Sequence, residues 1–170
     1  VTSGEKIREY VDGHFRTEHK DGYTYTQAFS EDGTPAGGAQ AKRVTLKFSN
    51  YKTGIFDYDA ASGKYLVSQY GKPHTDGALD QQVSATNVLV LETDIHVISG
   101  DTYGRLAVDL TGGGKGTCFC GGKSVPIRWS KASRNDPLVY TTEDGAPLTL
   151  GQGTSYVCIV NPKTSTLSVS

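Results

Sequence analysis

The feature of the sequence that most restricts the fold is a long apolar run, NVLVLETDIHVI, which extends from Asn87 to Ile98. Its aliphatic residues are leucine or β-branched, and β-branched residues favour strands over helices. A strand with one solvent-exposed face shows alternating apolar and polar residues, and this run lacks that alternation. Its continuous apolar character is typical of a strand buried on both faces. We therefore expect one central strand here, in the core of the domain.

Shorter strands with alternating residues precede this run. In RVTLKFS, apolar and polar residues alternate from Val44 to Phe48, as in a half-buried strand. The next two runs, GIFDYD and KYLVSQY, are joined by Ala-Ala-Ser-Gly, a four-residue connection that predicts a hairpin built on a type I turn. Phe56, Tyr58 and Tyr65 are then expected to meet on one face.

Glycine-rich connections separate the strands that follow. We expect turns at Gly112–Gly114, Gly121–Lys123 and Asp144–Gly145, because glycine readily adopts the positive φ of tight hairpins. The stretch TGGGKGT resembles a phosphate-binding loop in composition, but it lacks the P-loop spacing, and a β-run follows it instead of a helix. The sequence thus predicts a mainly β domain, an antiparallel β-sandwich or a partly open barrel of short strands.

A short helix is expected near the N-terminus. Ile7, Tyr10 and Val11 fall at helical spacing, and Ser3 is a suitable N-cap. Gly13 limits the length of this helix.

The residues that follow this helix have the composition of a loop. Residues 22–40 are rich in Gly, Thr, Ser and Pro, which predicts a loop with one short strand around Tyr23–Thr26. We therefore divide the chain into residues 1–40, the remnant of an N-terminal region or linker, and a β-rich domain over residues 41–170. No charged and apolar leader follows Val1, so we expect any targeting segment to lie outside this sequence.

Charge and composition narrow the classes of function. The chain carries 17 Lys and Arg residues against 18 Asp and Glu residues, for a net charge of −1. Nucleic-acid-binding proteins usually carry a basic excess, so we expect no nucleic-acid partner.

We also expect no membrane-spanning helix, because the sequence has no apolar run of sufficient length. The GxSxG and HExxH motifs are absent, which favours a function without catalytic residues and without a cofactor.

Three cysteines are too few and too unevenly spaced for a zinc ribbon or a disulfide-rich scaffold. Cys118 and Cys120 share one face if residues 115–120 form a strand, and Cys158 on another strand could pair with one of them. The sequence is compatible with three states of these cysteines: buried free thiols, one disulfide, or a metal or redox site.

The segment GKPHTDG, Gly71–Gly77, is a candidate site, because loops punctuated by Gly and Pro often carry function. His74 and Asp76, joined by Asp57 or Asp59 from the preceding hairpin, would supply the three ligands that a catalytic metal needs. A simpler interpretation is that Asp76 caps the turn and His74 is hydrogen-bonded, while the other two carboxylates lie on a solvated strand face.

Aromatic residues offer another candidate site. Tyr70, Tyr103 and Trp129 would form a platform for sugars or peptides if their rings were exposed side by side. Aromatic residues that alternate in strands usually fill a core instead.

The chain contains, in this order, FxYD at 56–59, SGxY at 62–65, GKPHxD at 71–76, TNVLV at 86–90, GGGKG, CGGK, Trp129 followed by Lys131, DGAPLTL and GQGTSYVCIV. Taken together, these motifs resemble those of the YerB-like lipoprotein family. The resemblance is clearest from Thr45 to Val160, and the preceding FSEDGTPAGGAQA resembles the approach to the family's C-terminal domain.

The resemblance implies an extracytoplasmic protein of Gram-positive bacteria, held at the cell membrane by an N-terminal lipid anchor that this sequence lacks. It implies a β-rich C-terminal domain and no established activity. In the family pattern a basic residue lies two positions after the tyrosine of SGxY, where this chain has Val67. That difference puts in doubt the binding of an anionic partner beside His74 and Asp76.

We therefore expect a non-enzymatic module that binds or scaffolds an unknown protein or polymer of the cell envelope. The candidate binding residues are His74, Asp76, Asp57, Asp59, Tyr70 and Trp129. A metal-assisted hydrolase acting on an envelope polymer, with His74 and Asp76 as candidate ligands, is one alternative, and a glycan-binding module is another.

Overall fold

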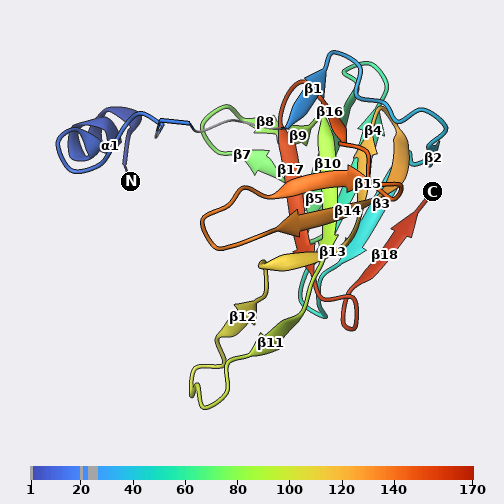
Figure 1. Cartoon of the computed structure of the whole chain (residues 1–170). Coiled ribbons are helices and arrows are strands. Elements are labelled where there is room, and N and C mark those ends of the chain that lie inside the picture. The colour runs from blue at the N-terminus through green and yellow to red at the C-terminus, as the bar shows by residue number, and fades with distance from the viewer. Residues whose placement is uncertain (1, 20, 23–26) are drawn as a thin grey trace.

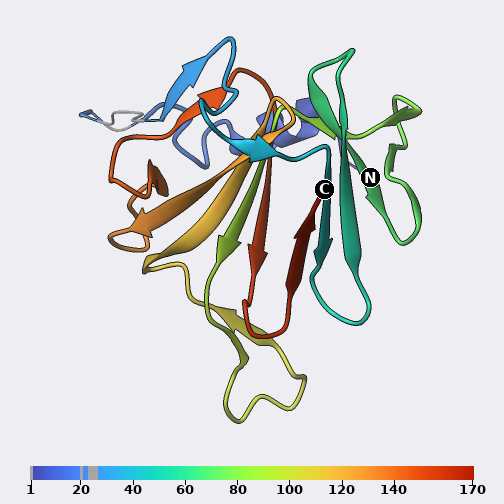
Figure 2. The same cartoon turned by 90° about the vertical axis from the view of Figure 1, so that its right-hand side faces the viewer.

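The structure is a computed structural model, and it describes residues 2–19, 21–22 and 27–170. In this part of the chain, most strands belong to two sheets that face each other (Figures 1 and 2). This arrangement confirms the predicted mainly β class and the sandwich. Neither sheet closes into a barrel, and two of the strand pairs are parallel, so the sandwich is not purely antiparallel.

Sheet 1 has six strands, of which five follow one another across the sheet and the sixth pairs with the second. In this order they are β15 (Val139–Thr142), β14 (Lys123–Lys131), β13 (Gly112–Cys120), β10 (Asn87–Glu92) and β17 (Ser155–Val160), with β2 (Ala39–Gln40) beside β14.

Sheet 2 also has six strands, of which five follow one another across the sheet and the sixth pairs with the fourth. In this order they are β18 (Thr166–Val169), β3 (Arg43–Lys47), β4 (Thr53–Asp59), β5 (Lys64–Gln69) and β6 (Lys72–Pro73), with β9 (Ser84–Ala85) beside β5.

Three further pairs of short strands lie outside the two sheets. They are β1 (Ala28–Ser30) with β16 (Thr149–Gly151), β7 (Thr75–Asp76) with β8 (Gln81–Gln82), and β11 (Ile95–Val97) with β12 (Leu106–Val108).

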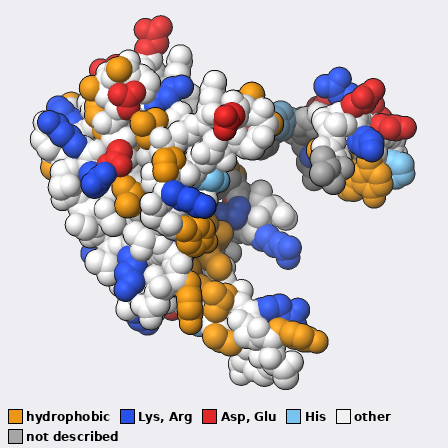
Figure 3. All heavy atoms as spheres, turned by 180° about the vertical axis from the view of Figure 1, so that it is seen from behind, with side chains coloured by type: hydrophobic (Ala, Val, Ile, Leu, Met, Phe, Trp, Pro, Cys, Tyr) orange, Lys and Arg blue, Asp and Glu red, His pale blue; other side chains and the backbone are white. Residues whose placement is uncertain are grey.

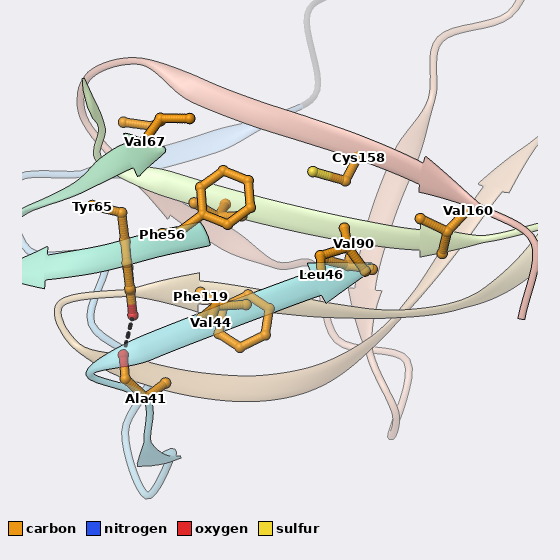
Figure 4. Packing of buried hydrophobic residues seen from close by; sticks show 12 residues of the cluster. Ala41, Val44, Leu46, Phe56, Tyr65, Val67, Val90, Phe119, Cys158 and Val160 are labelled. Carbon is orange, nitrogen blue, oxygen red and sulfur yellow. Dashed lines mark hydrogen bonds between the residues drawn. The ribbon is translucent and has the colours of Figure 1, made fainter. Parts of the chain in front are cut away.

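Two hydrophobic cores lie on the two faces of sheet 1. Core 1 fills the space between the sheets (Figure 4), where Phe56 and Tyr65 of sheet 2 meet Phe119 of sheet 1. The hydroxyl of Tyr65 donates to the carbonyl oxygen of Ala41 at 2.9 Å, which satisfies this buried polar group. Core 2 lies on the other face of sheet 1 and includes Leu150 of β16.

The central strand β10 contributes to both cores, because successive side chains of a strand point to opposite faces. Val88 and Val90 lie in core 1, whereas Leu89 and Leu91 lie in core 2. All four side chains are buried, so the prediction of a central strand buried on both faces is confirmed for this segment.

The predicted strand is wrong beyond Glu92, where the chain leaves sheet 1. Thr93 and Asp94 are polar, and burying such residues on both faces of a sheet would be costly. The carboxylate of Asp94 instead lies 2.7 Å from the Nδ1 atom of His96 at the surface. The remaining apolar residues form the arm β11–β12, which projects from the sandwich and exposes hydrophobic side chains (Figures 1 and 3).

The predicted turn at Gly112–Gly114 is also wrong, because these glycines begin the long strand β13. Gly114 pairs in register with Trp129 of β14, and the indole lies across the glycine. Trp129 is only 2% exposed, and its Nε1 donates to the carbonyl oxygen of Glu92 at 3.0 Å. A Cβ atom at Gly114 would lie 2.6 Å from that Nε1 and 2.5 Å from the same oxygen. Position 114 therefore requires glycine, because the indole of Trp129 and the carbonyl oxygen of Glu92 occupy the space that a side chain would need.

The other predicted hairpins are confirmed. Asp59 pairs with Lys64 across the four-residue connection between β4 and β5. Gly121 and Gly122 both have positive φ in the two-residue connection between β13 and β14. The predicted turn at Asp144–Gly145 closes through a hydrogen bond from the backbone N–H of Thr142 to the carbonyl oxygen of Ala146.

The three cysteines are free and buried. Cys118 lies in core 2, whereas Cys158 lies in core 1, on the opposite face of the same sheet. A disulfide between opposite faces would have to cross the backbone, which explains why these two thiols stay apart. Burial raises the pKa of each of these two thiols to about 12.

The predicted N-terminal helix is present as α1 (Gly4–Val11), with Ser3 as its N-cap. None of its residues is buried, and the helix lies away from the two sheets (Figure 1). The strand predicted around Tyr23–Thr26 falls outside the described residues. No helix of the described part is long and apolar enough to cross a bilayer.

The predicted domain boundary near residue 41 stays a prediction. Two short strands on its N-terminal side pair with later parts of the chain, because β1 lies parallel to β16 and β2 pairs with β14.

The contact between Gly114 and Trp129 can be tested by adding one methyl group. We expect Gly114→Ala to lower the free energy of unfolding by about 1–3 kcal/mol, because the new Cβ displaces the indole or the carbonyl of Glu92. Urea unfolding followed by fluorescence measures this, since Trp129 is the only tryptophan of the chain.

The matched control is Gly77→Ala, where a Cβ meets no atom within 4 Å. We expect this change to alter stability by no more than about 0.5 kcal/mol. Equal unfolding midpoints for the two variants would contradict the role given to Gly114.

Candidate functional site

The GKPHTDG segment begins inside a tight hairpin that joins β5 to β6. Gln69 pairs with Lys72, and the two residues between them, Tyr70 and Gly71, both have left-handed φ, at 54° and 75°. Such a two-residue connection matches the twist of the strands, but a bulky residue seldom occupies its first position. Tyr70 is thus held in an unfavourable conformation with its side chain 66% exposed, and strained residues of this kind cluster at functional sites.

His74 joins this hairpin to the rest of sheet 2 through its backbone. Its N–H donates to the carbonyl oxygen of Val67 at 3.0 Å, and its carbonyl oxygen accepts from the N–H of Val83 at 2.8 Å. The imidazole differs from the predicted hydrogen-bonded side chain, because its Nδ1 atom is buried without a partner. Buried polar atoms are rarely left unpaired, so this atom marks an unusual position.

Asp76 caps the next turn, as predicted. Its Oδ1 accepts from the backbone N–H groups of Ala78 and Leu79 at 2.8 and 2.9 Å. These two hydrogen bonds, followed by the nearby His74, hold the pKa of Asp76 below its ordinary value. The carboxylate is therefore used to fix the turn between β7 and β8.

A surface hollow of about 370 Å³ opens beside this hairpin. We call it the His74 hollow, and it is lined by Gln69, Tyr70, Lys72, Pro73, His74 and Thr75. These side chains include an amide, a phenol, an ammonium group, an imidazole and a hydroxyl, and no carboxylate is among them. The hollow is therefore rich in hydrogen-bond donors.

The two aspartates of the preceding hairpin do not join His74 and Asp76. Both carboxylate oxygens of Asp57 accept from the guanidinium of Arg43. Asp59 accepts from the backbone and the hydroxyl of Ser62 and so stabilises its own turn. Within the described residues, no group of three or more His, Cys, Asp or Glu residues is placed to hold a metal ion.

The three rings proposed as a platform are not exposed side by side. Trp129 is buried in core 2, where its indole lies over Gly114 of β13. Tyr103 lies near the tip of the β11–β12 arm, where the guanidinium of Arg105 lies 5.4 Å from the centre of its ring. Of the three, only Tyr70 borders the His74 hollow.

A second hollow, which the sequence did not predict as a site, lies at the other end of β5. We call it the polar cleft; it has a volume of about 340 Å³. Its lining comes from five separate segments of the chain: Glu31–Thr34, Tyr58 with Ser62–Lys64, Thr86, Cys120–Gly121 and Gln152. No regular spacing along the sequence joins these five segments.

Asn87 fixes one side of this cleft. It is fully buried, and its amide group donates to the carbonyl oxygen of Gly151 at 2.8 Å and accepts from the N–H of Gly151 at 2.9 Å. The side chain of Asn87 thus makes the two hydrogen bonds to the backbone of Gly151 that a neighbouring strand would otherwise make. This pairing holds the chain just before Gln152 against the start of β10.

Comparisons with known proteins agree with the resemblance seen in the motifs. The model of the family described as "Protein of unknown function (DUF3048) C-terminal domain" matches residues 44–157. The curated protein "Putative lipoprotein YerB" of Bacillus subtilis (strain 168) is 28% identical over 142 residues, which cover 83% of this chain and 41% of that protein.

The fold also matches a solved structure. The crystal structure of the YerB protein from Bacillus subtilis aligns with a TM-score of 0.79 at 23% identity, over 98% of this chain and 54% of that chain. The chain therefore spans about half the length of the relatives it matches.

The cap formed by Asp76 predicts a stability difference that depends on pH. A carboxyl whose native pKa is depressed stabilises the fold above its unfolded pKa of about 3.9, and this contribution is lost as pH falls through the native pKa. We expect Asp76→Ala to lower the urea midpoint at about pH 7, and to lower it progressively less below about pH 4.

Asp76→Asn is the matched control, because an asparagine oxygen can still accept at this turn but does not titrate. Its midpoint should lie between those of the wild type and Asp76→Ala at neutral pH. A difference between wild type and Asp76→Ala that stays constant down to about pH 2 would show that the carboxylate does not stabilise the turn.

Proposed function

Because this chain belongs to the family of DUF3048 C-terminal domains, we propose that it is the extracytoplasmic binding module of a bacterial lipoprotein. The name of its relative YerB supports attachment to a membrane through a lipid. In this proposal the module has no catalytic role, and it binds or scaffolds a protein or polymer of the cell envelope.

The observation that carries the proposal is the construction of the His74 hollow. Tyr70 is exposed, and its backbone has a conformation that costs about 1–3 kcal/mol in a non-glycine residue. The buried Nδ1 of His74 lacks a partner at the same place. Neither feature improves the packing of the domain, and both are expected where a surface is shaped for a partner.

The hairpin that carries the hollow is well supported by its neighbours. The backbone of His74 is bonded on both sides, to Val67 and to Val83, and Asp76 fixes the turn that follows. A hollow on such a support needs little ordering when a partner binds, which favours affinity. The donors of Gln69 and Lys72 favour a partner that is rich in hydrogen-bond acceptors.

The proposal can be tested by cross-linking from the hollow. A photoactivatable phenylalanine in place of Tyr70 should form a discrete adduct with one component of an envelope fraction from the source cells, and none with their cytosol. Unlabelled wild-type chain should compete for this adduct at least about tenfold better than the double variant Lys72→Ala/His74→Ala, a loss of about 1.4 kcal/mol.

The matched control places the same photoactivatable group at Tyr51, which is also exposed but does not line the hollow. The proposal fails if both positions give the same adducts, or if the double variant competes as well as the wild type. Equal unfolding midpoints of variant and wild type show that the comparison is between folded proteins.

A further inference from the structure

We propose that the polar cleft is a second binding site, and that it takes a single neutral sugar residue. The cleft lies at the start of β5, whereas the His74 hollow lies at the end of the same strand. The two sites can therefore be occupied and tested independently of each other.

The walls of the cleft are held in place by contacts that leave no room for side chains. A Cβ atom at Gly33 would overlap the backbone of Gly151, and one at Gly121 would overlap the hydroxyl of Thr34. At Gly153 a Cβ would overlap the hydroxyl of Thr86. Segments that touch so closely, through backbone at Gly33 and through threonine hydroxyls at Gly121 and Gly153, cannot shift without breaking contacts, so the cleft is formed before a ligand arrives.

The polar groups that line the cleft include both acceptors and donors. Glu31 and Asp32 offer carboxylate oxygens, whereas Lys64 and Gln152 offer N–H groups. The hydroxyl of Ser62 donates to Asp59 at 2.6 Å, which leaves its oxygen free to accept from a ligand. Each sugar hydroxyl is a donor and an acceptor at once, so a sugar can pair with all of these groups.

The mixed charges of the lining disfavour a ligand that carries a strong charge of one sign. An anion would meet the carboxylates of Glu31 and Asp32, and a cation would meet the ammonium group of Lys64. Lys123 also acts on Asp32 electrostatically, which further balances the cleft. A neutral ligand with many polar groups is the class that fits this mixture.

The volume of the cleft and the aromatic residue in its wall agree with a sugar ligand. Tyr58 lines the cleft with a ring that also packs against Tyr65, and aromatic rings supply a flat apolar surface for the C–H groups of a sugar. A volume of about 340 Å³ lies at the low end of ordinary ligand sites, which start at roughly 300 Å³. The cleft therefore has room for one sugar ring and not for a long stretch of polymer.

Nuclear magnetic resonance of the ¹⁵N-labelled chain tests this proposal. The probes are glucose, galactose, mannose and N-acetylglucosamine, each added up to about 50 mM, with inorganic phosphate as the anionic probe. We expect at least one sugar to cause saturable shifts of the backbone amides of Gly33, Gly121 and Gly153, and phosphate to cause none there.

Variants then locate the site. Lys64→Ala and Gln152→Ala should each weaken the binding of that sugar about tenfold, whereas Lys72→Ala in the His74 hollow should leave it unchanged. The proposal is overturned if no sugar gives saturable shifts at these amides, or if Lys72→Ala alone weakens binding.

Discussion

Both hydrophobic cores depend on β10, because its side chains point alternately into each of them. The strand is bonded to β13 on one side and to β17 on the other, so its position fixes the centre of sheet 1. Sheet 2 packs on one face of this strand, and the segment around β16 covers the other. Five of its six residues are buried, so a displacement of this strand would expose apolar surface on both faces of the sheet.

The two candidate sites owe their shapes to this rigid frame. The polar cleft is tied to the first residue of β10, because the amide of Asn87 holds the backbone of Gly151. The His74 hollow lies on the far end of β5, where backbone hydrogen bonds to Val67 and Val83 hold its hairpin. Strain at Tyr70 and an unpaired nitrogen at His74 persist there because the surrounding strands are stable.

The sequence predicts much of the fold, because burial and turn chemistry are local signals. The central strand, several hairpins, the N-cap at Ser3 and the cap at Asp76 follow from residue patterns. The glycines at Gly112–Gly114 mislead, since glycine serves both turns and close packing, and only the structure places the indole of Trp129 over Gly114. The polar cleft has no local signal, because its lining comes from five segments that are far apart in the sequence, two of which are brought together by the parallel pairing of β1 with β16.

Native-state hydrogen exchange tests the central role of β10 most directly. If both cores depend on this strand, the amides of Val88–Leu91 exchange only through global unfolding, with the free energy that urea unfolding gives. The amides of α1 and of the β11–β12 arm should exchange through local opening, at free energies near zero, because these elements bury few side chains. Exchange of the β10 amides at a free energy well below that of global unfolding would contradict the dependence of both cores on this strand.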